Sequence, residues 1–209
     1  DDDLGAEFGE ELAEAAGALE DAPPADAAEV APEPATPEAE AAPAGEAIPE
    51  VEPRTGPELK MPAPSSVIEM LGELIEGAVA SPYHGAPPFE AQMPGYYFVT
   101  LDDDGGQTVG AMVADARCVA QMGGRLMAME EDEIIDGMID GLPCEDMIDG
   151  MGEVFNTLNV TVNKVPGNVH VRPSQLVPWD VSKIPWMLEC ANRLDLQDCY
   201  GGKMAFVAR

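Results

Sequence analysis

Residues 146–160 read DMIDGMGEVFNTLNV, and the spacing of their apolar side chains decides how the rest of the chain is interpreted. On a helix of 3.6 residues per turn, Met151, Phe155 and Leu158 fall within one narrow stripe. A stripe of this kind is buried against another element in a folded domain. The stretch is therefore predicted to be an amphipathic helix with one side in the core.

The opposite side of this predicted helix is polar. Asp149, Glu153 and Asn156 stand four and then three residues apart, at about 100°, 140° and 80° around the axis from Ile148. They share one face, so they are either a solvated surface or a set of groups that act together. The [D/S]xxxExxN pattern is short, and the elements around it are needed to choose between these interpretations.

Two helices and a hairpin are predicted upstream. SSVIEMLGELIEGAVA, residues 65–80, has a serine pair as candidate N-cap and apolar residues at helical spacing. YYFVTLDDDGGQTVGAMVA, residues 96–114, has two apolar runs around a DDDGG turn, which is typical of a β-hairpin. The segment that begins at Asp115, a plausible N-cap, has helical spacing again, interrupted by the packing or turn glycines Gly123 and Gly124.

Downstream, the acidic stretch 130–143 is interpreted as a loop or short helix, and VHVRPSQLVPWD, residues 169–180, as a strand ended by prolines. Residues 182–192 are ambiguous. RLDLQDCYGGKMAFVAR, residues 193–209, is a second predicted hairpin, turning at its glycine pair. The order predicts an α+β fold over residues 65–209, with an antiparallel sheet packed against two long helices.

Residues 1–64 have a different composition. They hold 11 of the 20 prolines, many alanines and glutamates, and a single aromatic residue. Such a segment cannot bury enough apolar surface to offset the entropy of ordering it, so a disordered acidic tail is predicted. Leu4, Phe8, Leu12 and Leu19 recur at roughly helical spacing, which leaves open a short docking helix or a solvated charged run.

The charge of the chain excludes two classes of partner. It carries 40 acidic and 10 basic residues, a formal net charge of −30. Phosphate binding rests on Lys and Arg contacts, so we expect binding to neither nucleic acid nor anionic lipid. The absence of a long apolar run argues against membrane insertion. No run of about 18 apolar residues occurs, and three aspartates stand where a secretory signal needs a positive start. We expect a cytoplasmic protein.

Other candidate metal and catalytic groups are few. Cys118, Cys144, Cys190 and Cys199 form no CxxC pair, and we expect them to be reduced thiols in the core. The two histidines have no metal-like spacing to a cysteine or to each other. The DDDGG turn lacks the spaced ligands and closing glutamate of an EF-hand. No metal or cofactor of its own is predicted for this chain.

The helix with the DxxxExxN face, with the order of elements around it, resembles the CheC/CheX/FliY family of chemotaxis phosphatases. The resemblance covers roughly residues 65–209 and leaves the tail unexplained. It implies a CheX-like domain that docks a phosphorylated CheY-like receiver, the response regulator of two-component signalling, and hydrolyses its aspartyl phosphate. The matching positions are Asp149, Glu153 and Asn156.

The resemblance also implies a role for each position. Asn156 is expected to orient the attacking water, because a neutral amide both donates and accepts hydrogen bonds without repelling phosphoryl oxygens. Glu153 is expected to pair with the lysine of the partner's active site. Asp149 is expected to support docking or the helix itself. Mg2+ is expected on the partner receiver, in that protein's own acidic pocket.

Two features keep other interpretations open. The run NTLNVTVN after the motif has asparagines where family members often carry glycine and small residues, and the surface is acidic. Both favour a catalytically inactive CheX-like domain that binds a receiver or a flagellar-motor component. An unrelated α+β domain is a third interpretation.

The first predicted helix bears on how many sites the chain holds. It offers Glu69, Glu73 and Glu76 at the motif spacing, which sets a carboxylate where an amide is needed. At most one working site per chain is therefore expected. Proteins of the CheX type pair through their sheets, so the resemblance also implies a homodimer.

Overall fold

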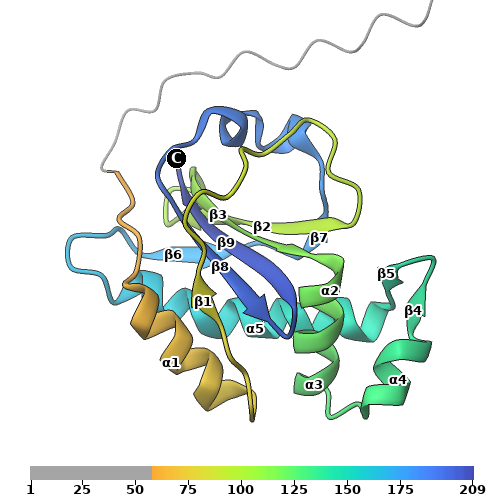
Figure 1. Ribbon diagram of the computed structural model, residues 1–209. Helices are drawn as coiled ribbons and strands as arrows, with labels where there is room; N and C mark the ends of the chain where they lie inside the picture. Colours follow the sequence, from red (N-terminus) through yellow and green to blue (C-terminus); the bar gives the residue numbers. More distant parts are fainter. Residues whose placement is uncertain (1–57) are drawn as a thin grey trace, which may run out of the picture. The chain divides into compact units, whose positions relative to one another are not determined.

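The computed structural model describes residues 58–209 (Figure 1). The helices are α1 (Pro64–Leu74), α2 (Ala116–Cys118), the π-helix η1 (Val119–Gly123), α3 (Gly124–Leu126), α4 (Glu131–Asp136), α5 (Glu145–Asn163) and the 3-10 helices η2 (Val181–Lys183) and η3 (Pro185–Glu189). The strands are β1 (Ser81–Pro82), β2 (Tyr96–Asp103), β3 (Thr108–Asp115), β4 (Met138–Ile139), β5 (Leu142–Pro143), β6 (Val171–Pro173), β7 (Val177–Pro178), β8 (Arg193–Cys199) and β9 (Gly202–Ala208). Residues 1–57 of the predicted disordered tail, with the short helix predicted near residues 4–19, lie outside the described residues, whereas residues 58–64 are ordered and the prediction of disorder is wrong for them.

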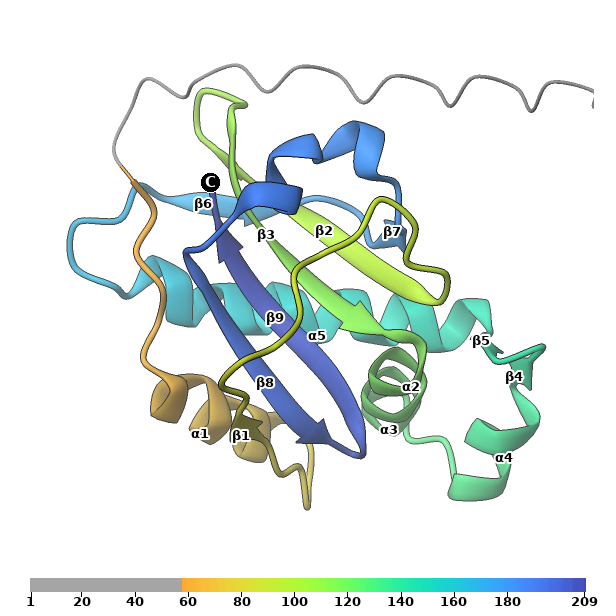
Figure 2. The same ribbon diagram turned by 45° about the horizontal axis from the view of Figure 1, so that its top comes forward.

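One antiparallel sheet organises the fold, as predicted. Its strand order is β1-β8-β9-β3-β2-β6, and β7 also pairs with β2. Figure 2 shows β8, β9, β3 and β2 side by side. The two predicted hairpins are β2–β3 and β8–β9. The second turns at Tyr200 and Gly201, one residue earlier than predicted, because Cys199 pairs with Gly202.

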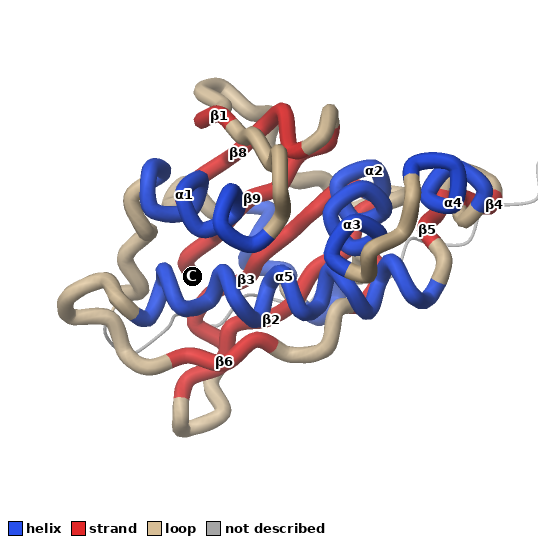
Figure 3. Tube along the Cα trace, turned by 90° about the horizontal axis from the view of Figure 1, so that it is seen from below, coloured by secondary structure: helices blue, strands red, loops and turns tan. Residues whose placement is uncertain are grey.

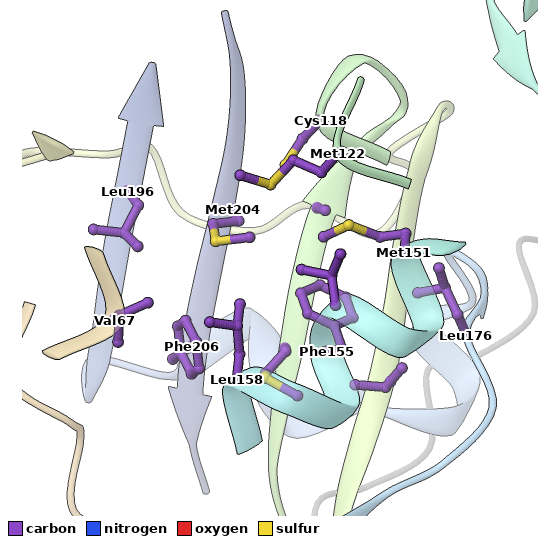
Figure 4. Close-up of a cluster of buried hydrophobic side chains, with 14 of the residues drawn as sticks. Val67, Cys118, Met122, Met151, Phe155, Leu158, Leu176, Leu196, Met204 and Phe206 are labelled. Atoms are coloured by element: carbon purple, nitrogen blue, oxygen red, sulfur yellow. The ribbon is translucent and has the colours of Figure 1, made fainter. Parts of the chain in front are cut away.

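Helices cover one face of this sheet. α1, the α2–η1–α3 segment and α5 all lie on that side (Figure 3). Between them and the strands lies the main core, which includes Val67, Phe155, Leu158, Leu196 and Phe206 (Figure 4). Each of these five side chains is at most 1% exposed. The predicted apolar stripe of residues 146–160 is therefore buried against the sheet.

The other face of the sheet is covered by η2, η3 and the irregular segment 83–95. Phe89, Trp186 and Met187 form a second core there with Phe98 of β2. Because apolar groups cover both faces, the central strand β3 is buried continuously from Val109 to Ala114. The ambiguous stretch 182–192 therefore belongs to this cover and not to the sheet.

The prediction of two long helices is only partly met. α5 has 19 residues, whereas α1 has 11 and the third helical segment changes from α to π and back to α. α1 begins at Pro64 without a side-chain cap from the serine pair, and it ends at Leu74. Gly77 follows with a φ of 76°, so the chain turns away after the helix. One long helix and two shorter helical segments cover the sheet.

Packing extends upstream of residue 65. Leu59 is fully buried in the main core. The backbone N–H of Lys60 donates to Asn168 Oδ1 at 2.8 Å, and Asn168 Nδ2 donates to the Lys60 carbonyl at 2.9 Å. The last residues of the proline-rich stretch are thus part of the folded domain.

Asp115 caps α2 as predicted. Its Oδ1 accepts the Cys118 N–H at 2.8 Å, and its Oδ2 accepts the Lys203 N–H at 3.0 Å. The same carboxylate therefore ties the start of the helix to β9. Burial raises the pKa of Asp115, and these two hydrogen bonds act in the opposite direction.

Candidate functional site

The candidate site is the solvent side of α5. Asp149, Glu153 and Asn156 are all exposed there, opposite the buried stripe shown in Figure 4. No hydrogen bond or ion pair joins their side chains to any other residue within 58–209. Glu153 and Asn156 are separated by about 60° around the helix and about 4.5 Å along it. The acid and the amide are therefore neighbours on an open surface.

Two glycines bring α5 against η1. A Cβ on Gly123 of η1 would lie 1.9 Å from the carbonyl oxygen of Met147 on α5. A Cβ on Gly150 of α5 would lie 2.3 Å from the carbonyl oxygen of Gly123. These partners are main-chain atoms, so the two backbones touch at a distance that side chains do not allow. Of the two predicted roles for Gly123, packing or turn, the structure supports packing.

Two asparagines that follow the motif hold the other side of α5. Asn159 Nδ2 and Asn163 Nδ2 both donate to the carbonyl oxygen of Val171 in β6, at 2.8 and 3.0 Å. Asn163 Oδ1 accepts the Val171 N–H at 2.9 Å. The unusual asparagines of NTLNVTVN thus have a structural function. Asn156 is the one asparagine of α5 whose side chain faces solvent.

The charge on α5 has one sign. The helix contains Glu145, Asp146, Asp149 and Glu153 and no basic residue. Glu145 and Asp146 lie in the first turn, where the helix dipole favours a negative charge. Asp149 and Glu153 lie beyond that turn, and like charges at i and i+4 destabilise a helix by about 0.2–0.5 kcal/mol. This pair has no stabilising function in the fold that we can identify.

Two further residues belong to the same exposed side and were not predicted as site residues. Val160 stands four residues after Asn156 and is 40% exposed, although it is apolar. Gly152 stands between Asp149 and Asn156, and a Cβ there would meet nothing within 4 Å. The sequence could have identified them, because the helical wheel places Val160 at about 120° and Gly152 at about 40°, beside the three polar residues of the site.

α1 does not repeat this site. Glu69 and Glu73 line a hollow of about 510 Å³ between α1 and the C-terminal end of α5, where Lys164 also lies. Glu76 lies beyond the end of α1 and does not share a helix face with them. The three glutamates at motif spacing therefore do not form a second exposed triad.

The part of the chain that the structure describes holds neither a cluster of metal ligands nor a membrane-spanning helix. Within it, no group of three or more His, Cys, Asp or Glu side chains is placed to hold a metal ion. No helix among residues 58–209 combines the length and the apolar character needed to cross a membrane. The four cysteines are all free, with Cys118 and Cys199 buried in the main core.

No protein-family profile and no curated protein sequence matches the chain. Among solved structures, its fold is similar to the chemotaxis protein CheX from Vibrio vulnificus, with 11% sequence identity and a TM-score of 0.45 over 69% of this chain and 93% of that one. It is also similar to FliY from Thermotoga maritima, with 12% identity and a TM-score of 0.45 over 68% and 82% of the two chains.

A third similar structure is the CheX–CheY–BeF3–Mg complex from Borrelia burgdorferi, with 11% identity and a TM-score of 0.41 over 69% of this chain and 92% of the matched chain. A CheC-like chemotaxis protein is also among the solved structures that the fold resembles.

Proposed function

We propose that residues 58–209 form a CheX-like domain that docks a phosphorylated CheY-like receiver through α5 and hydrolyses its aspartyl phosphate. The observation that carries the proposal is the joint exposure of Glu153 and Asn156, one turn apart and without partners among the described residues. The helix that presents them is held on both sides, by Gly123 on η1 and by Val171 on β6. A rigid helix with an open acid and amide suits insertion into another protein's pocket.

The chemistry follows from the amide. Asn156 can accept a hydrogen bond from a water molecule through Oδ1 and donate to it through Nδ2, which holds the water in line with the phosphorus. The water oxygen forms a bond to phosphorus while the bond to the receiver's carboxylate oxygen breaks. The products are inorganic phosphate, which takes both protons of the water as H2PO4−, and the free aspartate carboxylate of the receiver.

Glu153 positions the helix on its partner. Its carboxylate would form an ion pair with the lysine of the receiver's active site, which places Asn156 one turn further along over the phosphoryl group. Asp149 stands one turn before Glu153 and would support docking through the same positive surface. Mg2+ would be held by the receiver's acidic pocket and would neutralise phosphoryl charge there.

A second candidate function is binding without hydrolysis. The carboxylates along α5, with no basic residue in that helix, favour it, because negative charge repels a phosphoryl group. In this alternative the domain holds a receiver or a flagellar-motor component and leaves the aspartyl phosphate intact.

Phosphate release separates the two functions. CheY-type receivers from the same genome, charged with acetyl phosphate and Mg2+, would be mixed with the full chain and with the Asn156→Ala and Glu153→Ala variants. Hydrolysis predicts faster release with the wild type, a loss of about 100-fold or more in Asn156→Ala, and weaker binding in Glu153→Ala. Asn163→Gln, changed at the structural asparagine about two turns after Asn156, controls for loss of helix anchoring. Binding with an unaccelerated release rate would leave the scaffold function.

A cytoplasmic location and a homodimer accompany the proposal. The sheet face away from the helices is covered by η2, η3 and residues 83–95, so two chains that pair through their sheets would have to use an edge. The edges are β1 on one side and β6 with β7 on the other. Light scattering after size-exclusion chromatography would measure the molar mass, which distinguishes a monomer from the proposed homodimer.

A further inference from the structure

Gly152 is a glycine that the fold does not need. It lies in the middle of the 19-residue α5, where glycine is less favourable than alanine. Gly150, two residues earlier, is required because a Cβ there would strike the Gly123 carbonyl. A Cβ on Gly152 would meet no atom within 4 Å. Packing within residues 58–209 therefore gives no reason for the missing side chain.

The bare position lies beside the carboxamide. Around the axis of α5, Gly152 falls at about 40°, Asn156 at about 80° and Glu153 at about 140°. A helical side chain leans toward the N-terminus and covers the turn before its own Cα. A side chain at position 152 would therefore cover the helix surface between Asp149 and Asn156. This surface lies on the side of the Asn156 amide that faces away from Glu153.

Other unfavourable local choices lie on the same side of α5. Asp149 and Glu153 repel each other at i and i+4, and Val160 exposes 40% of an apolar residue. Local rules of helix stability are broken in proteins mainly where function requires it. In α5 these unfavourable features all lie on one exposed face, within about three helical turns. Their grouping points to a partner surface that lies against this face.

We propose that Gly152 is the point of closest approach of the partner, where main chain of the CheY-like receiver lies against α5 next to Asn156. The inference rests on the proposed function, since the receiver is the occupant named there. The missing side chain lets the loop that carries the phosphoryl group reach the amide of Asn156. Gly152 is thus a positioning residue that acts by leaving space.

Gly152→Ala tests this inference, because it moves stability and binding in opposite directions. Alanine at an open mid-helix position should raise the Tm by about 2–4 °C. The added methyl group should weaken binding of a beryllofluoride-loaded receiver by about tenfold or more and slow phosphate release to match. Gly152→Leu should weaken binding further. Loss of folding cannot explain weaker binding by a more stable protein.

Gly72→Ala is the matched control. Gly72 is exposed two residues before the end of α1, and a Cβ there would meet only the Ala78 carbonyl, at 4.0 Å. This variant should bind and hydrolyse as the wild type does. Gly152→Ala and Gly152→Leu with wild-type binding would overturn the inference, and a concurrent loss in Asn156→Ala would keep the proposed function. A wild type that neither binds nor dephosphorylates any of the receivers would overturn both.

Discussion

The contact between Gly123 and α5 allows one prediction to be worked out in detail. A Cβ introduced by Gly123→Ala would stand 1.9 Å from the Met147 carbonyl oxygen and 2.8 Å from the Met151 nitrogen, whereas real Cβ contacts essentially never fall below 3.0 Å. Both partners are main-chain atoms, so no side chain can rotate to make room. η1 and α5 must therefore separate by about 1 Å.

The magnitude follows from that separation. Overpacking in a dense interior costs about 1–3 kcal/mol and more where the backbone moves. A gap of about 1 Å also removes up to roughly half of the dispersion attraction between facing atoms. The better helix propensity of alanine offsets about 1 kcal/mol at most. We expect a net loss of about 2–3 kcal/mol, which lowers the Tm by roughly 4–12 °C for a domain of this size.

Thermal unfolding followed by circular dichroism measures this effect. Gly152→Ala is the internal comparison, because the same substitution at an open position of α5 is expected to raise the Tm. A Gly123→Ala protein with a Tm equal to or above that of the wild type would show that η1 and α5 do not touch in the way described. The rigid placement of the exposed side of α5 would then lose its basis.

Two further predictions concern the anchoring and the interior of the domain. Asn163→Ala leaves the Val171 N–H unpaired and should lower the free energy of unfolding in urea by about 1–3 kcal/mol. Asn156→Ala, at an exposed position, should change it by less than about 0.5 kcal/mol, and equal effects would contradict the division of roles. Cys118 and Cys199 are both 0% exposed, so neither thiol should react with a disulfide reagent until the protein unfolds. The adjacent Cys199 thiol and burial also raise the pKa of Cys118. Prompt reaction of either in the native protein would contradict its burial.

The elements that could be predicted are those that local spacing determines. The repeat of Met151, Phe155 and Leu158 is enough to define the buried stripe of α5, because helix geometry alone places these residues together. The DDDGG turn likewise defines the β2–β3 hairpin. The exposure of Glu153 and Asn156 follows from the same wheel. A pattern with one period can be interpreted without knowledge of the rest of the fold.

The features that could not be predicted depend on segments far apart in the sequence. The sequence predicts Gly123 to be either a packing or a turn glycine, and only the position of Met147 on α5 decides for packing. Asn163 departs from the family pattern in sequence, and its reason is visible only in the fold, where it hydrogen-bonds to Val171 of β6. The end of α1 at Leu74, which leaves Glu76 beyond the helix, could not be predicted because the apolar spacing continues past Leu74.

The side-chain amides of Asn159 and Asn163, which both donate to the Val171 carbonyl, limit how α5 can move. They hold α5 by its flank, so the helix cannot roll about its long axis without giving up both attachments. Substitutions on the solvent side of α5 therefore change which groups are exposed and leave the orientation of the helix unchanged. Under the proposed function, a change of preferred receiver would require substitutions on the solvent side of α5 alone.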